Sequence, residues 1–333
     1  MKGLRKRAGV LAAVAVLAMS SLAGCSKDFT VDNNKVAAVV GDSEITLGLL
    51  NFYARYDQAG FESYYGSYYG EKMWKLELTE GMTLEESEKE GVLDTLKQAL
   101  ILENHMEEYG VAITAEDMAK FESVADKFIE ANGEAAALVS GDKAVIVEFL
   151  RLCTIQERMY NAMVADVSTE VPDEEAAQKK LAYLGFTETD AVSLEDALKE
   201  AEEFLAQAKE RGDLIELAEE QEAPANLLNY DDSTTTIAKE IMDAANALQD
   251  GEFAEIVKKD KSYYVVQLVS SFDKEATEIK KEQIVQERQD TKFDELYGEW
   301  VKSVEVTVYD EVVEEISLHG LKVTEKAEQK ENK

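Results

Sequence analysis

The stretch Thr169–Asp173 divides this chain into two different patterns of secondary structure. Its proline, Pro172, lacks a backbone N–H and pushes the preceding residue into an extended conformation, so a helix is not expected to continue through it. Before this stretch, apolar residues recur at helical spacing, and after it strands alternate with helices. The chain of 333 residues is therefore predicted to form two domains, each large enough to have an apolar core.

The N-terminal half begins with a predicted β-hairpin. The β-branched run Val36–Val40 and the short stretch Glu44–Ile45 flank a Gly41–Asp42 turn. Thr46 is placed to cap a helix from Leu47 to about Ala59. Nine aromatic residues lie between Phe52 and Trp74, but glycines 60, 66 and 70 interrupt them, so one continuous helix is not expected there.

Three further helices are predicted before the break, at about 83–109, 114–132 and 142–166. Thr83 with Glu86, and Thr114 with Asp117, have the spacing of N-terminal capping boxes. Leucines recur at helical spacing within the first of these helices, which is typical of a core-facing stripe.

The second half is predicted to hold a small mixed domain followed by a long helix. Its expected elements are a strand at 180–186, helices at 193–211 and 214–222, an irregular segment, a helix at 236–248, and strands at 254–257 and 263–269. A charged helix at 274–301 and a short strand at 304–308 follow. Beyond about Gly320 the chain is rich in Lys and Glu, and we expect it to be disordered.

Cysteine and histidine give little support for a metal site or a hydrolase. Cys153 lies in an apolar helical pattern, so a buried structural thiol is expected rather than a nucleophile. The two histidines, His105 and His319, are far apart in sequence and have no cluster of ligand residues around them. No zinc, phosphate-loop or serine-hydrolase motif is present, so neither a metal nor a cofactor is predicted.

The first 24 residues have the order of a secretory signal sequence, with a basic start, the apolar run Gly9–Met19 and small residues before Cys25. The segment Leu22–Cys25 resembles the lipobox of bacterial lipoproteins, in which the cysteine is acylated and becomes the mature N-terminus. An ordinary secretion signal with a chance cysteine is the alternative. The resemblance implies an extracytoplasmic protein that is anchored to the bacterial cell membrane through a lipidated Cys25.

The strong negative charge excludes one class of partner. Removing residues 1–24 removes four positive charges and no negative ones, so the net charge falls from −34 to −38. Affinity for nucleic acid depends on Lys and Arg contacts to phosphates, so no nucleic acid is expected as a partner. A heavily solvated surface that keeps an exported protein soluble explains the same composition.

Several segments together resemble the lipid-anchored PrsA-type foldases of Gram-positive bacteria and, more loosely, the periplasmic SurA-type chaperones. In the N-terminal half these segments are Val36–Thr46 and Tyr109–Asp117. In the second half, Ser193–Ala218, Ile241–Glu252 and Ser262–Leu268 are similar to parts of a parvulin prolyl isomerase domain. The order and spacing of these segments carry the resemblance, which covers nearly the whole mature chain.

The resemblance implies an α+β fold, in which a mostly helical SurA-like chaperone domain is built from the N- and C-terminal segments around an inserted small parvulin-like α/β domain. The expected parts are a signal peptide at 1–24, a tether at 25–34, a helical chaperone domain at 35–170, a parvulin-like domain at 175–272, a returning helix and strand at 273–319, and a disordered tail at 320–333.

The parvulin-like segment departs from its family at the residues expected around the prolyl pocket. Tyr183 and Tyr264 stand where the family has histidines. The other departures are Ala223–Pro224 near the expected acid or thiol, with Glu222 as a shifted substitute, Asn226–Tyr230 in place of a glycine-rich turn, and Ile241 and Asn246 in place of pocket phenylalanines. Tyrosine can donate a hydrogen bond, as histidine can. The combined losses nevertheless predict a prolyl isomerase activity that is weak or absent.

The expected function is therefore that of a membrane-anchored chaperone that binds unfolded or extended exported polypeptides. Tyrosine gives a large amphipathic contact area at low entropic cost, which suits sequence-tolerant binding. The candidate client-binding residues come from the aromatic-rich segment and are Tyr53, Tyr56, Tyr64, Tyr65, Tyr68, Tyr69 and Trp74. The alternative for these rings is that they pack the N-terminal helices against one another.

Two other functions stay open at this point. The first is an active peptidyl-prolyl isomerase, which an isomerase assay separates from a chaperone without activity. The second is a solute-binding lipoprotein of a transporter, which predicts two lobes of repeated strand–helix units. No such repeat is visible in the sequence. A homodimer is neither required nor excluded.

Overall fold

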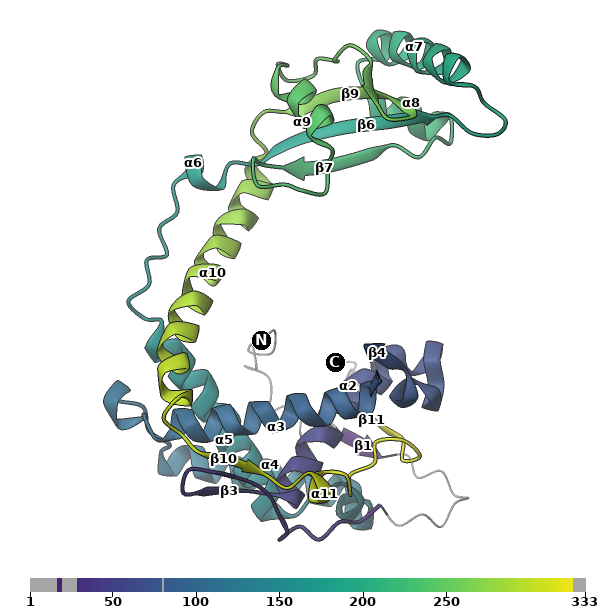
Figure 1. Cartoon of the computed structure of the whole chain (residues 1–333). Helices are drawn as coiled ribbons and strands as arrows, with labels where there is room; N and C mark the ends of the chain where they lie inside the picture. Colours follow the sequence, from purple (N-terminus) through teal and green to yellow (C-terminus); the bar gives the residue numbers. More distant parts are fainter. Residues whose placement is uncertain (1–16, 20–28, 80, 326–333) are drawn as a thin grey trace, which may run out of the picture. The chain divides into compact units, whose positions relative to one another are not determined.

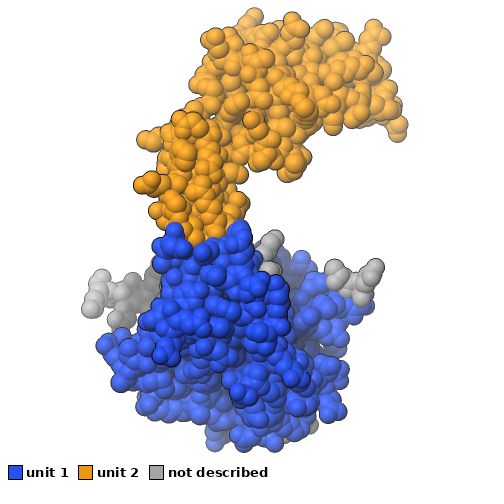
Figure 2. Space-filling view, turned by 60° about the vertical axis from the view of Figure 1, so that its left-hand side comes forward, with its two compact units in different colours: residues 1–166, 291–333 blue, residues 167–290 orange. Residues whose placement is uncertain are grey.

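A computed structural model of the chain describes residues 17–19, 29–79 and 81–325. The chain forms two compact units, which Figure 2 shows in different colours. The first consists of residues 1–166 and 291–333, and the second of residues 167–290. Cys25, the predicted lipidation site, lies outside the described residues.

Four long helices build the first unit, together with the C-terminal end of α10 (Lys274–Val301). They are α2 (Leu47–Tyr69), α3 (Leu84–Glu103), α4 (Ala115–Asn132) and α5 (Lys143–Met163), with short 3₁₀ turns η1 (Gly70–Lys75), η2 (Glu107–Tyr109) and η3 (Gly133–Val139) between them. Edge-to-face aromatic contacts join three of the helices, because the Phe52 ring lies 5.5 Å from Phe128 and 5.4 Å from Phe149. Cys153 is buried on α5, as expected.

Short strands complete the first unit (Figure 1). The strands β2 (Val36–Val40) and β3 (Ser43–Thr46) form the predicted hairpin, and β10 (Val306–Val308) pairs with the other side of β2. The remaining elements are the hairpin of β4 (Glu77–Thr79) and β5 (Met82–Thr83), the pair β1 (Leu17–Met19) and β11 (Val323–Glu325), and the short helix α11 (Asp310–Val313).

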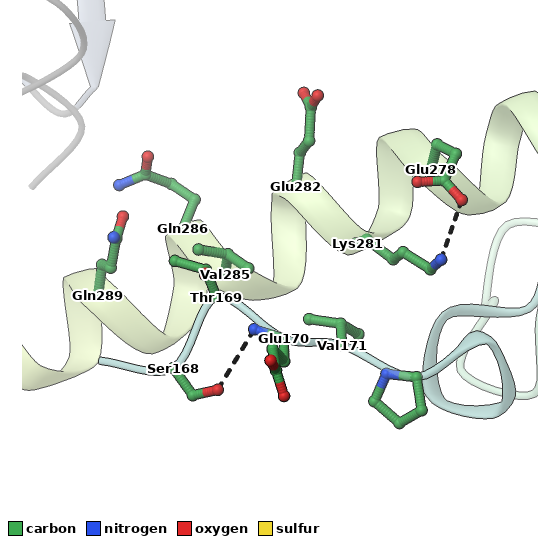
Figure 3. Close-up of a pocket in the computed structure, with 11 residues that line it drawn as sticks. Ser168, Thr169, Glu170, Val171, Glu278, Lys281, Glu282, Val285, Gln286 and Gln289 are labelled. Carbon is green, nitrogen blue, oxygen red and sulfur yellow. Dashed lines mark hydrogen bonds and ion pairs between the residues drawn. The ribbon is translucent and has the colours of Figure 1, made fainter. Parts of the chain in front are cut away.

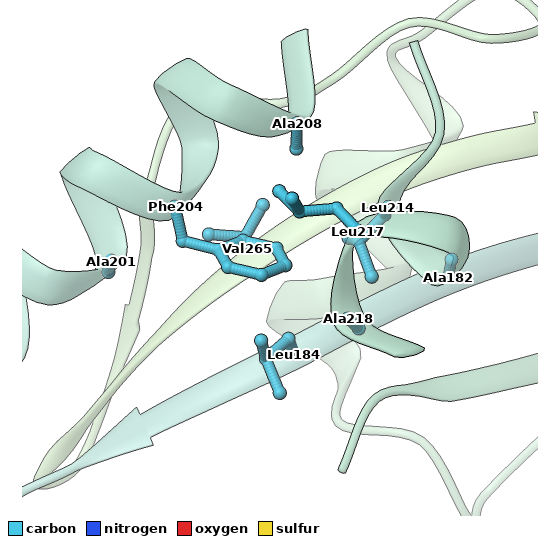
Figure 4. Packing of buried hydrophobic residues seen from close by; sticks show 9 residues of the cluster. All are labelled: Ala182, Leu184, Ala201, Phe204, Ala208, Leu214, Leu217, Ala218 and Val265. Atoms are coloured by element: carbon cyan, nitrogen blue, oxygen red, sulfur yellow. The ribbon is translucent and has the colours of Figure 1, made fainter. Parts of the chain in front are cut away.

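The second unit is built on one antiparallel sheet in the order β7-β6-β9-β8. Its strands are β6 (Lys179–Thr187), β7 (Asn226–Tyr230), β8 (Val257–Lys259) and β9 (Ser262–Ser270), and its helices are α6 (Asp173–Ala176), α7 (Leu194–Arg211), α8 (Leu214–Glu220), α9 (Lys239–Asn246) and most of α10. Each face of the sheet has its own apolar core. On one face, Phe204 of α7 and Leu217 of α8 pack over Leu184 and Val265, as Figure 4 shows.

The opposite face of the sheet is covered by α9. Ile241 and Ala245 of this helix pack against Leu181 and Val266, and Tyr230 at the end of β7 is buried with them. Alternation along β6 and β9 thus sends successive side chains into two different cores. This explains why the central residues of both strands are apolar on both faces.

The mixed α+β class is confirmed, and so are both capping boxes, where the Thr83 and Thr114 hydroxyls accept from the backbone N–H three residues later. Three expectations are wrong. Helix α2 runs unbroken through Gly60 and Gly66, because burial of its N-terminal half and the bonds of Glu62 to Trp74 and Val323 outweigh the cost of two helical glycines. The segment expected to be irregular contains β7, which pairs with β6.

The third wrong expectation concerns the C-terminal tail, which was predicted to be disordered beyond about Gly320. Leu321 and Val323 are buried, and β11 pairs with β1. Apolar burial therefore outweighs the charged composition at least as far as Glu325, while residues 326–333 lie outside the described part. No helix among the described residues is long and apolar enough to cross a membrane.

Candidate polypeptide-binding surfaces

Both ends of the aromatic-rich segment belong to the core, which corrects part of the prediction. Tyr53 and Trp74 are each only 1% exposed. The Tyr53 ring lies 4.8 Å from Phe149, and the Trp74 indole donates to the Glu62 carboxylate over 3.0 Å. Tyr56 is half-buried with its ring 5.2 Å from Phe149. Tyr53 faces inward because the N-terminal half of α2 lies among the other helices of its unit, and Trp74 faces inward because η1 packs back on α2. Neither can therefore bind a client from solvent.

The second half of α2 presents its tyrosines to solvent. Tyr64, Tyr65, Tyr68 and Tyr69 are 73, 42, 84 and 55% exposed, and we refer to these four as the tyrosine patch. Their rings are close together, with centroids 4.7 Å apart for Tyr64–Tyr65 and 6.5 Å apart for Tyr65–Tyr69. Further along the chain, the segment that leads into and forms the β4–β5 hairpin adds the exposed apolar side chains of Leu76, Leu78 and Met82.

A polar cluster fixes the helical turn from which the tyrosine patch projects. Glu62 accepts hydrogen bonds from Gln58 of the preceding turn, from the Trp74 indole and from the backbone N–H of Val323. The bonds from Trp74 and Val323 join α2 to η1 and to β11. The exposed tyrosines are therefore carried by a helix end that is held from two sides rather than by a free extension.

A buried arginine, Arg55, lies two turns before Glu62 on the same helix. Arg55 is 2% exposed and donates to Gln58 Oε1 and to the backbone carbonyl of Ser317, each over 2.7 Å. Burial lowers the pKa of Arg55 to about 10, against the smaller opposing effects of the Glu62 and Glu85 charges. Arg55 therefore stabilises the C-terminal segment at Ser317 through a buried hydrogen bond, and it is not accessible to a ligand.

In the second unit, the two tyrosines at the expected histidine positions lie on the same face of the sheet. Tyr183 is on β6 and Tyr264 on β9, with their rings 6.1 Å apart in an edge-to-face arrangement. Tyr264 lies opposite Gly185, and a Cβ atom at that position would come within 2.9 Å of the Tyr264 ring. Glycine at 185 thus gives the Tyr264 ring room over the strand. Both tyrosines are only partly buried.

The surroundings of this tyrosine pair differ from what a prolyl pocket with histidines would need. Ile241 is buried in the α9 core, and Asn246 accepts from Lys179 over 2.7 Å and from the Tyr230 hydroxyl over 3.1 Å. Burial raises the pKa of Tyr230 to about 12, so this hydroxyl keeps its proton. Glu222 sits at a strained position with φ of +53°, beyond the end of α8.

Both histidines of the chain belong to the first unit. The second unit, which contains Tyr183 and Tyr264, has no histidine of its own. The His105 ring stacks on Trp300 at 3.9 Å and its Nδ1 lies 2.9 Å from Glu108. His319 Nδ1 lies 2.8 Å from Glu85. The described residues contain no group of three or more side chains that could hold a metal ion.

One further feature, which no motif in the sequence predicted, is an open cavity of about 930 Å³ between the extended segment Ser168–Pro172 and α10 (Figure 3). Val171 and Val285 supply apolar surface, and the rim carries glutamate and glutamine side chains. Lys281, whose ammonium also borders the cavity, is paired with Asp173 and Glu278. An extended linker that runs beside a helix leaves such a groove, and the domain break at Pro172 was the sole signal for it.

By its fold, the chain is an α+β protein in which an antiparallel sheet unit is inserted into a helical unit. No protein-family model matches the sequence, and neither does any curated protein. Among solved structures, the chain is similar to the foldase protein PrsA from Lactococcus lactis, with 16% identity, 86% of this chain and 98% of that chain covered, and a TM-score of 0.32.

Two further solved structures are similar in the same way. One is described as showing PEB4 and the periplasmic protein Cj1289 of Campylobacter jejuni to be SurA-like chaperones; it has 10% identity, covers 83% of this chain and 99% of its own, and gives a TM-score of 0.29. The other is the foldase protein PrsA from Streptococcus pneumoniae, with 16% identity, coverages of 73% and 99%, and a TM-score of 0.30. The names of these solved structures are those of the foldases and chaperones that the sequence resembles.

Proposed function

We propose that this chain is an extracytoplasmic chaperone that binds unfolded, exported polypeptides. The observation that carries the proposal is the tyrosine patch. Large aromatic side chains that are exposed together on a soluble protein favour an interaction surface, because a monomer gains nothing by leaving them in water. Tyrosine contacts apolar segments with its ring and polar backbone with its hydroxyl, so it tolerates many sequences.

The composition supports a client of this kind. The net charge of −34 keeps the chain soluble at the high local concentrations near a membrane and repels anionic surfaces. Extended segments with positive charge and apolar side chains are the partners that such a surface attracts. The charge also makes binding weaker as salt increases, whereas the apolar contacts of the tyrosine patch are insensitive to moderate salt.

We further propose that Cys25 is acylated and holds the chain on the outer side of the cell membrane. The support is the order of residues 1–25, with basic, apolar and small residues before a single cysteine. Two acyl chains give stable attachment where a single chain does not. Replacing Cys25 by Ser is expected to abolish incorporation of radiolabelled palmitate and to move the protein from the membrane pellet to the soluble fraction. Retention in the pellet without label contradicts the anchor.

The chaperone proposal is tested with the mature chain carrying Cys25→Ser, mixed with a chemically unfolded client diluted into buffer, while light scattering is recorded. Suppression of scattering at near-equimolar ratio is expected. A quadruple variant with Ser at 64, 65, 68 and 69 should lose most of it, while Tyr309→Ser should not. Tyr309 is the matched control because it is 41% exposed in the same unit but lies outside the tyrosine patch. Equal suppression by the quadruple variant contradicts the proposal.

In this proposal, prolyl isomerase activity is weak or lost. The support is the substitution pattern around Tyr183 and Tyr264. The solute-binding alternative receives no support, because the strands described pair only in antiparallel fashion and do not form parallel, doubly wound lobes.

A further inference from the structure

A strand from the predicted signal sequence occupies the edge of β11. Leu17–Met19 pairs antiparallel with Val323–Glu325, with Ala18 opposite Thr324 in the middle (Figure 1). The strand β1 also contacts α4, and β11 packs on α2. Residues 17–19 of the apolar leader therefore lie in extended form between a strand edge and a helix of the first unit.

The edge that receives this strand is held in place by bonds that do not involve the leader. Gln58 donates to the carbonyls of Leu318 and Leu321, each over 2.8 Å, and Glu62 accepts from the Val323 N–H over 2.9 Å. One helix further, the Lys89 ammonium donates to the carbonyl of Ile316 over 3.2 Å. Because Val323 is also 1% exposed, the β11 backbone is preorganised as a template.

The bond to Glu62 also fixes which backbone groups of β11 face the incoming strand. Successive N–H groups of a strand point in opposite directions, and the Val323 N–H points to α2. The N–H and C=O of Thr324 therefore point to β1, and Thr324 with Ala18 is the hydrogen-bonded pair of this ladder. Met19 opposite Val323 is a non-hydrogen-bonded pair.

We propose that, once the leader is removed, β11 accepts an extended apolar segment of an exported polypeptide as an added strand. This proposal rests on the proposed function, since it assumes cleavage before Cys25 and a polypeptide client. The strand β1 is itself an extended part of an apolar leader. Its pairing with β11 therefore indicates the kind of segment that this strand edge accepts. Strand addition takes its affinity from main-chain hydrogen bonds, which suits clients of varied sequence. An uncovered edge is otherwise a site of unwanted pairing.

The test uses the mature chain with Cys25→Ser and a fluorescent peptide of residues 14–21 flanked by lysines, followed by fluorescence anisotropy. Saturable binding is expected. N-methylation of the peptide at Ala18 removes the donor of the central pair and should weaken binding about tenfold. N-methylation at Met19, whose N–H points away from β11, is the matched control and should change binding little. The full chain with its leader retained should bind the peptide more weakly, because the leader competes within the molecule.

Hydrogen exchange gives a second readout that needs no change to the protein. The Thr324 amide should exchange rapidly in the mature chain and become protected when the peptide binds, while the Val323 amide is protected in both states. Equal binding of the two N-methylated peptides overturns the proposal. Protection of Thr324 without peptide, together with a dimer in analytical ultracentrifugation, also overturns it, because a second copy then occupies the edge.

The outcomes separate this inference from the proposed function. The quadruple variant of the tyrosine patch should bind the peptide as the unaltered chain does, because β11 is a different surface. Peptide binding with the expected N-methyl pattern, but without suppression of client aggregation, supports strand addition and contradicts the chaperone role. Suppression of aggregation with no difference between the two peptides contradicts strand addition alone.

Discussion

At the scale of single residues, a half-buried carboxyl pair joins two helices of the first unit. Glu88 of α3 is hydrogen-bonded to Asp57 of α2. Burial, with a further contribution from the Asp57 charge and hydrogen bond, raises the pKa of Glu88 to about 8. At neutral pH the pair therefore holds one proton, which lets two carboxyl groups lie side by side between the helices.

This pair makes stability depend on pH. In the unfolded chain Glu88 ionises near pH 4.5, whereas in the folded chain it stays protonated up to about pH 8. The folded state thus binds more protons over this window, and stability falls as pH rises through it. Glu88→Gln keeps the hydrogen bond without the charge, so we expect a higher Tm than the unaltered chain at pH 8 and a similar Tm at pH 4.5. Glu90→Gln, at an exposed position nearby, controls for net charge. Equal shifts for both variants contradict the prediction.

The tyrosine pair of the second unit gives a prediction about catalysis. Prolyl isomerisation has a barrier of about 18–20 kcal/mol, and lowering it needs groups that stabilise a twisted amide in an apolar slot. Tyr183 and Tyr264 stand side by side, but Ile241 and Asn246 provide no aromatic wall. The mature chain should therefore isomerise a proline-containing tetrapeptide at the uncatalysed rate. A rate well above background that is lost in both Tyr183→Phe and Tyr264→Phe identifies an active isomerase instead.

At the scale of elements, α2 shows how tertiary contacts override local propensity. Gly60 and Gly66 both lie within the helix, and a Cβ atom at Gly60 would meet nothing within 4 Å. Gly60→Ala should therefore stabilise the protein by roughly 0.5–1 kcal/mol. Gly70, just after the helix, has φ of +57°, so Gly70→Ala should destabilise it. Urea unfolding followed by circular dichroism measures both. A loss of stability in Gly60→Ala would show that the site is more crowded than described.

The sequence predicted those elements whose signals are local. The capping boxes at Thr83 and Thr114 and the whole of α10 follow from residues a few positions apart. It did not predict that the Asp117 carboxylate also binds Arg158 of α5 over 2.7 Å, which holds the pKa of this carboxyl well below its usual range. Nor did it predict β7 or β11, since each depends on a distant strand. Non-local pairing has no signature in a single segment.

The candidate site was predictable to a similar extent. The sequence points to the aromatic-rich segment as the candidate, but periodicity could not say which of its rings face solvent. Tyr53 is buried because α5, far away in sequence, covers it, and Trp74 is buried because η1 packs back on α2, while Tyr64 and Tyr68 are exposed. The juxtaposition of Tyr183 and Tyr264 needed the register of β6 against β9, which only the structure supplies.

At the scale of the whole molecule, the second unit has the features of an inserted domain. The strands β6 and β9 pair along their whole length, with Lys180 opposite Ser270, so the chain enters and leaves the sheet at the same place. Bonds across this junction close it: the Asp273 N–H donates to the Gln178 carbonyl over 2.7 Å, and Lys180 pairs with Asp273 over 3.1 Å. Adjacent ends and separate cores are what an independently folding insert requires.

A fragment of residues 173–280 is therefore expected to fold alone and to unfold in a single cooperative transition in urea. The buried Thr277 hydroxyl accepts from the Gln178 N–H over 3.1 Å and donates to the Asp273 carbonyl over 2.7 Å, joining both ends of the insert. Thr277→Val keeps the shape but leaves the Gln178 N–H unpaired, so it should destabilise the fragment by about 1–3 kcal/mol. Thr277→Ser keeps the hydroxyl, so it should destabilise the fragment by less than Thr277→Val does. If the fragment shows no cooperative transition, or if Val and Ser at 277 are equivalent, this junction does not stabilise the insert and the unit depends on the rest of the chain.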